Sequence, residues 1–154
     1  MTRVMTTHRR VAGSSVACAE YLYLPGAFVE EGVLPVRLNY ASDSLRVLCT
    51  TRDALISAWG DRWTPVGVCI QVVAAAASLA DVATFAALTL VFDPPTSDVT
   101  VEHHHAELLL RAVDGRGRRY VIQDSSREAL MSVTAATIVD IHCDGQSSAQ
   151  ALGA

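Results

Sequence analysis

Asp81 is the residue whose setting most clearly suggests chemistry. It is the only charged residue between Thr64 and Phe92. A carboxylate among apolar side chains is costly to bury unless it is paired, and acids in such settings serve as general bases or nucleophiles. The sequence therefore makes Asp81 the first candidate catalytic residue. The alternative is a buried acid that an arginine or backbone donors satisfy at a dimer interface.

Three further polar residues lie close to Asp81 in the sequence. Ser78 and Thr84 are three residues before and after it, so on a helix they share its face. A hydroxyl there can hold a water molecule beside the acid, whereas the alternative is a small residue where a helix meets a sheet. Gln71 stands at the start of the predicted helix, where it either contacts a substrate or caps the helix in solvent.

A histidine cluster is the second candidate site. His103, His105 and Glu107 are spaced by two residues, so on a strand they point to the same face. Three such side chains could bind a metal such as zinc. The alternative is a polar strand face at a subunit contact or beside a ligand. We favour the alternative and predict no metal.

Length and composition restrict what can position these residues. The chain has 154 residues and a formal net charge of −4, which fits one domain over residues 1–154 with residues 1–15 as a flexible tail. A hydrophobic content of 51% with 18% charged residues excludes a disordered chain. The acidic balance argues against non-specific nucleic-acid binding. Four scattered cysteines without a CxxC pair are typical of buried thiols in a cytoplasmic protein.

The order of the predicted elements is two strands, one long helix and four further strands. The helix covers residues 71–91 (Gln71 to Val91), because this segment is rich in Ala and Leu, and the prolines after it end it. Residues 52–61 form a short helix or a loop. The predicted strands cover residues 33–40, 44–51, 98–113, 118–127, 131–143 and 147–152, with turns at Asp114–Gly117 and Asp144–Gly145.

A helix that is apolar on every side needs cover on every side. A membrane-spanning segment is the other explanation of such a run, but it fits poorly because a charge in mid-bilayer is costly. We therefore expect an antiparallel sheet that wraps around one long central helix, which is an α+β fold.

The segments on either side of this helix resemble a known family. The resemblance covers residues 70–154 and is to the hot-dog-fold acyl-CoA thioesterases of the PaaI-like group. It rests on residues 78–83 (Ser-Leu-Ala-Asp-Val-Ala), 99–102 (Val-Thr-Val-Glu), 109–112 (Leu-Leu-Arg-Ala) and the final hairpin from Thr137 to Gly153.

The resemblance implies an activity and an assembly. Its implied function is hydrolysis of an acyl-CoA or acyl-carrier-protein thioester by a homodimer or homotetramer, with no cofactor, nucleic acid or membrane partner. In similar enzymes the acid at Asp81 attacks the thioester or activates water. The implied oxyanion donors are the backbone N–H groups of Val73 and Ala74. The arginines near the turn at Asp114, with Arg111 and Arg118 first, could bind the phosphates of coenzyme A, or simply face solvent.

One feature of the family is missing. Its helix commonly begins with His-Gly-Gly, where this chain has Val72, Val73 and Ala74. The alternative function is therefore a non-catalytic hot-dog protein that binds an acyl ligand or serves as an assembly module.

Overall fold

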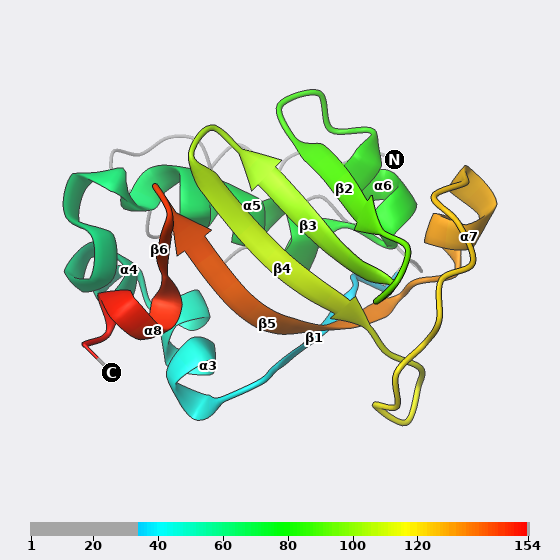
Figure 1. The fold of residues 1–154 in the computed structure, drawn as a ribbon, viewed down its shortest axis with the longest axis horizontal. Coiled ribbons are helices and arrows are strands. Elements are labelled where there is room, and N and C mark those ends of the chain that lie inside the picture. The colour runs from blue at the N-terminus through cyan, green and yellow to red at the C-terminus, as the bar shows by residue number, and fades with distance from the viewer. Residues whose placement is uncertain (1–33, 154) are drawn as a thin grey trace, which may run out of the picture.

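The structure is a computed structural model and describes residues 34–153. Its centre is a sheet with strand order β1-β5-β4-β3-β2, in which β6 also pairs with β5. Neighbouring strands are antiparallel except β1, which runs parallel to β5. The strands are β1 (Arg37–Tyr40), β2 (Thr89–Asp93), β3 (Asp98–His103), β4 (Ala106–Ala112), β5 (Ala135–Cys143) and β6 (Gln146–Ser147). The α+β class is thus confirmed (Figure 1).

Helices cover one face of this sheet. In Figure 1 helix α5, the longest helix within residues 34–153, lies behind β3 and β4, and it contacts both strands. The helices of this part of the chain, with the 3-10 turn η3, are α3 (Asp43–Thr50), α4 (Arg52–Trp59), η3 (Gly60–Arg62), α5 (Trp63–Ala75), α6 (Leu79–Ala83), α7 (Arg127–Met131) and α8 (Ser148–Ala151).

The core forms where α5 meets the sheet. On β4 the buried residues alternate with more exposed ones, since Leu108 and Leu110 have no exposed surface while Glu107 is exposed. Period-two alternation places Leu108 and Leu110 on the helix-covered face. On α5, Val66 and Val73 are almost fully buried and belong to the same core.

The predicted single helix over residues 71–91 is wrong. Helix α5 begins earlier, at Trp63, and ends at Ala75, after which Ala76 and Ser78 are extended (ψ 152° and 171°). Residues 89–93 are strand β2, which pairs with β3. A long run with a single charged residue, Asp81, has no polar face to reveal its period, so helix and strand could not be separated within it. A sheet wrapped around one long helix is therefore not confirmed.

The predicted strand at residues 44–51 is helix α3 instead. The Ser42 hydroxyl accepts a hydrogen bond from the Leu45 N–H (3.1 Å) and caps its first turn. Leu45, Leu48 and Cys49 are buried at the spacing of one helix face. The helix predicted as one possibility for residues 52–61 is confirmed as α4.

The sheet meander differs from the prediction in three places. Residues 98–113 are not one extended stretch but the hairpin β3–β4, which turns at His104 and His105, with His104 at φ 53°. Residues 118–127 form no strand beyond an isolated bridge from Arg119 to Val113. Residues 148–151 are helix α8, because Ser147 and Gln150 form a capping box. The turn at Asp144–Gly145 is confirmed.

Three of the four cysteines lie in the described part of the chain. Cys49, Cys69 and Cys143 are free and buried, which confirms the prediction for them. Burial raises the pKa of the Cys49 and Cys69 thiols to about 12, so both stay protonated. Cys18 and the tail predicted over residues 1–15 lie outside the described residues. Within residues 34–153, no helix has both the length and the apolar character needed to span a bilayer.

Candidate functional site

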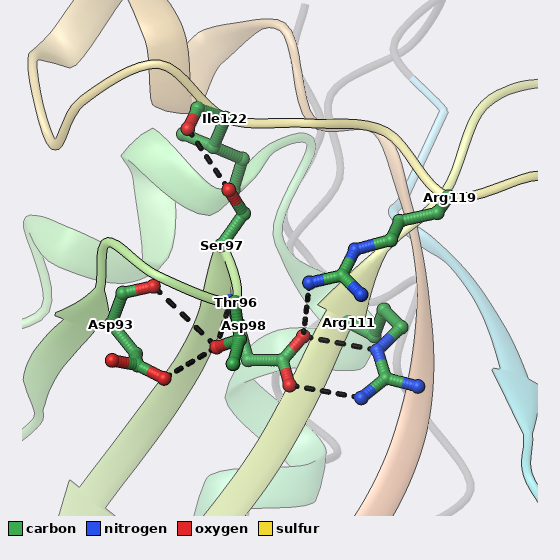
Figure 2. Close-up of polar contacts among 7 residues, drawn as sticks. All are labelled: Asp93, Thr96, Ser97, Asp98, Arg111, Arg119 and Ile122. Atoms are coloured by element: carbon green, nitrogen blue, oxygen red, sulfur yellow. Dashed lines mark hydrogen bonds and ion pairs between the residues drawn. The ribbon is translucent and has the colours of Figure 1, made fainter.

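Asp98 and Arg111 form the best-buried ion pair of the sheet. They face each other across β3 and β4, and two N–H groups of the Arg111 guanidinium donate to the two Asp98 carboxylate oxygens at 3.0 Å each (Figure 2). The Asp98 side chain is only 9% exposed. The hydrogen bonds and charge of Asp98 raise the pKa of Arg111, so the guanidinium remains charged.

The surroundings of Asp98 complete its hydrogen bonding. Its backbone N–H donates to the Thr96 hydroxyl (3.2 Å), and Arg119 approaches its carboxylate at 4.0 Å (Figure 2). The neighbouring Ser97 hydroxyl donates to the Ile122 carbonyl oxygen (3.2 Å). These contacts connect the loop after β4 to the start of β3. The contacts of Asp98 therefore stabilise the fold.

A pocket of about 270 Å³ lies beside this loop. Its walls come from the start of β1, the turn after β4 and the segment that enters β5. Backbone hydrogen bonds fix these walls together: the Arg37 N–H donates to the Thr134 carbonyl (2.9 Å) and the Val113 N–H to the Ala135 carbonyl (3.0 Å). The lining residues are Arg37, Val113, Asp114, Gly115, Tyr120, Ser132, Thr134 and Ala135.

Arg37 is the one cationic residue that lines the pocket. Its guanidinium donates to the Gly115 carbonyl oxygen (3.2 Å), which holds it across 78 residues of sequence. Among residues 34–153 it has no carboxylate partner within ion-pair distance. Because a guanidinium carries five N–H donors, most of its donors remain open to a ligand.

Asp114 is the acidic residue of the pocket, and the turn itself holds it. Its carboxylate accepts hydrogen bonds from the backbone N–H groups of Arg116 (2.8 Å) and Arg118 (2.9 Å) and from the Arg118 guanidinium (2.9 Å). The backbone N–H groups of Arg118 and Arg116, followed by the Arg118 side chain, hold the pKa of Asp114 below its usual range. Its carboxylate therefore stays charged, and Arg118 balances part of that charge.

Asp81 lies away from the enclosed setting expected for it. It is exposed in the first turn of α6, where its carboxylate accepts a hydrogen bond from the Ala77 N–H (3.2 Å). Thr84 follows at the end of this short helix and donates to the Asp81 carbonyl oxygen (2.7 Å), while Ser78 is buried at its N-cap. The structure keeps these three residues together, but on a short surface helix.

The expected oxyanion donors do not stand at a helix start. Val73 and Ala74 are in the last turn of α5, where helix geometry directs their N–H groups to carbonyl oxygens four residues earlier. That premise is therefore wrong, because the helix begins at Trp63. Gln71 is 2% exposed and lies inside the same helix rather than at its start.

The three residues of the histidine cluster do not share one strand. His103 ends β3, His105 lies in the turn, and Glu107 is on β4. The His103 ring nitrogen Nδ1 contacts the Ala87 carbonyl oxygen (2.9 Å), whereas His105 is 3.7 Å from Asp144. No group of three His, Cys, Asp or Glu side chains in residues 34–153 is placed to hold a metal ion.

An Asp-His-Ser group at the other end of β5 has the residue types of a hydrolytic triad. Asp140 accepts from the Ser148 hydroxyl (2.6 Å) and lies 3.0 Å from His142 Nε2. In a hydrolytic triad the serine contacts the histidine, whereas here both contact the aspartate. Burial raises the pKa of Asp140, but the hydrogen bonds from Ser148 and Ile141 outweigh it and the net pKa is lowered. This group anchors α8 to the sheet.

The arginines predicted to bind phosphates already have acidic partners. Arg111 pairs with Asp98 and Arg118 pairs with Asp114. Sequence reasoning missed Arg37, Tyr120 and Thr134, since only the parallel pairing of β1 with β5 brings them together and no local motif marks them. Comparison of the chain with protein-family models, with curated proteins and with solved structures finds no match.

Proposed function

We propose that this domain binds a small organic anion in the pocket beside the loop after β4. The observation that carries the proposal is Arg37, a guanidinium that lines the pocket without an acidic partner in the described chain. Arg111 and Arg118, by contrast, each form an ion pair with an aspartate. A planar guanidinium with open N–H groups is suited to a carboxylate, which it can bind through two parallel hydrogen bonds.

The size of the pocket restricts the ligand. Its volume of about 270 Å³ lies just under the range of roughly 300–1,000 Å³ typical of drug-sized ligands. An anion of a few carbon atoms fits this space, whereas coenzyme A would extend far outside it. Val113 and Ala135 add apolar atoms to the wall, which can contact a short aliphatic chain.

The lining favours binding over catalysis. It contains no histidine or cysteine, and its serine, Ser132, donates its hydroxyl hydrogen bond to the Glu128 carbonyl oxygen (3.2 Å). Asp114 is held ionised by the turn. A nucleophile needs an adjacent general base, and the pocket offers no such pair.

The test is a titration of isotope-labelled protein with propionate, followed by backbone amide chemical shifts. We expect saturable shifts at the pocket residues, and their loss in Arg37→Gln. The matched control is Arg62→Gln, which removes an exposed arginine that pairs with Asp144 at the opposite end of β4 and β5. Equal binding by wild type and Arg37→Gln would contradict the proposal.

Hydrolysis of an acyl thioester is the second candidate function. Its candidate acid is Asp81, whose exposed carboxylate accepts a hydrogen bond from the Ala77 N–H and lies outside the lining of the pocket described above. The measurement is release of coenzyme A from acyl-CoA substrates of increasing chain length. We expect Asp81→Asn to abolish any turnover, and equal turnover in this variant would exclude the role of Asp81. Self-association and a cytoplasmic location stay predictions.

A further inference from the structure

The pocket presents an acidic acceptor beside its guanidinium. Arg37 donates to the carbonyl oxygen of Gly115, the residue that follows Asp114 in the chain, and Asp114 itself lines the pocket. The two side chains do not form an ion pair with each other, because Asp114 pairs with Arg118. Arg37 and Asp114 thus belong to one pocket lining without pairing with each other.

Asp114 has one hydrogen-bonding position left. A carboxylate offers about four acceptor positions, two on each oxygen. The two backbone N–H groups of Arg116 and Arg118 occupy Oδ1, and the Arg118 guanidinium occupies one position on Oδ2. The side chain of Asp114 is 29% exposed, so the remaining position on Oδ2 is open to a donor.

We infer that the ligand is a small α-amino acid, whose carboxylate binds Arg37 and whose ammonium group donates to Asp114. This inference rests on the proposed function. In an α-amino acid a single carbon atom separates the two charged groups, which suits a guanidinium bonded to Gly115 and a carboxylate on the residue before it. The hydroxyls of Tyr120 and Thr134, which also line the pocket, make no hydrogen bond within residues 34–153 and are free for the ligand.

The apolar part of the wall favours an aliphatic side chain on this amino acid. Val113 and Ala135 both belong to the pocket lining. Alanine is accordingly the probe. Its three-carbon analogues separate the contributions: propionate has only the carboxylate, lactate adds a hydroxyl donor and propylamine has only the ammonium group.

The experiment is a titration of the full chain with these four compounds, monitored by amide chemical shifts. A hydrogen bond between two charged groups outweighs a neutral one. Alanine should therefore bind at least about tenfold more tightly than propionate, lactate should fall between them, and propylamine should not bind. Equal affinity for alanine and propionate would overturn this inference and leave the anion pocket standing. Failure of all three acids to bind would overturn both.

Two variants locate the effect. Asp114→Asn keeps a side-chain oxygen for the two backbone N–H groups of the turn, so we expect it to bind propionate as before and to lose the preference for alanine. Arg118→Gln removes the competing cation and leaves Asp114, so the preference should persist or increase. A preference for alanine that survives in Asp114→Asn would place the ammonium contact elsewhere and overturn the assignment.

Discussion

Arg111 and Arg37 are separated by one strand of the sheet, yet their charges are used differently. Arg111 on β4 pairs with Thr137 of β5 in the strand register, and Arg37 on β1 pairs with Ala135 of the same strand. The first guanidinium is locked on the nearly buried Asp98 by two hydrogen bonds of 3.0 Å. The second makes one hydrogen bond to a carbonyl oxygen.

The difference shows which arginine is structural and which is available. An arginine in a two-pronged pair with a buried acid stabilises the fold, since separating the pair would leave a charge without a partner. An arginine held by a carbonyl oxygen is oriented without being neutralised. The two arginines therefore have different roles. Arg111 stabilises the fold because its partner is a carboxylate, whereas Arg37 can bind a ligand because its partner is a carbonyl oxygen.

The largest expected effect comes from breaking the structural pair. Asp98→Ala leaves the Arg111 guanidinium without its acid and removes two charge-assisted hydrogen bonds. Because Arg111 is 40% exposed and can recover some hydration, we expect a loss of about 2–3 kcal/mol in the free energy of unfolding, below the roughly 3–5 kcal/mol typical of fully buried pairs. Urea denaturation measures it. A loss under about 0.5 kcal/mol would contradict the structural role.

The second effect separates binding from stability. Arg37→Gln should lower the affinity for a small carboxylate by at least about tenfold, since it removes the charge of a charge-assisted pair. Its free energy of unfolding should change by less than about 0.5 kcal/mol, as for other exposed substitutions. Calorimetric titration measures the affinity, and urea denaturation of the same preparation measures the free energy of unfolding. A large loss of stability with unchanged affinity would reverse the roles given to Arg37 and Arg111.

A third, smaller effect is the loss of unfolding free energy when an exposed ion pair is broken. Arg62 and Asp144 are 2.6 Å apart, but the side chain of Arg62 is 53% exposed. Solvent screening limits such pairs to about 0.2–1 kcal/mol, so Arg62→Gln should destabilise the protein less than Asp98→Ala does. An equal or larger loss of unfolding free energy would show that burial does not explain the difference between the Arg62–Asp144 and Asp98–Arg111 pairs.

The smallest expected effect is a pH dependence at Asp114. Its pKa is lowered in the folded state by the backbone N–H groups of Arg118 and Arg116. Its contribution to stability is therefore fully present above the unfolded pKa of about 3.9 and is lost as the pH falls through the lower folded value. The difference in unfolding free energy between wild type and Asp114→Ala should shrink as the pH falls below about 4. A difference that stays constant from pH 6 to pH 2.5 would contradict the assignment.

The predictable parts of the fold were those with a local signal. The turn at Asp144–Gly145 carries residues that tolerate positive φ, and the thiols were recognisable as buried by their scattered positions. The segment over residues 71–91 carried no such signal, because an apolar run with a single charged residue fits a helix and a strand equally well. The hairpin turn at His104 and His105 also lacked a glycine that would mark it.

The candidate site was harder to predict than the fold. Arg111 and Arg118 were visible as members of a basic cluster, but their partners depend on the register of β3 with β4 and on the conformation of one turn. Arg37 was missed because it meets Gly115 only through the pairing of β1 with β5. Contacts between residues so distant in sequence leave no periodic pattern.

The most direct test of the central claim is to observe the guanidinium of Arg37 itself. In a titration with alanine, the Nε–Hε resonance of this residue should shift in a saturable manner, with the same dissociation constant as the amides of the turn at Asp114. The Nε–Hε resonance of Arg111 should stay unchanged, since Asp98 already holds it. Shifts at Arg111 without shifts at Arg37, or no saturable shift at either, would contradict the account.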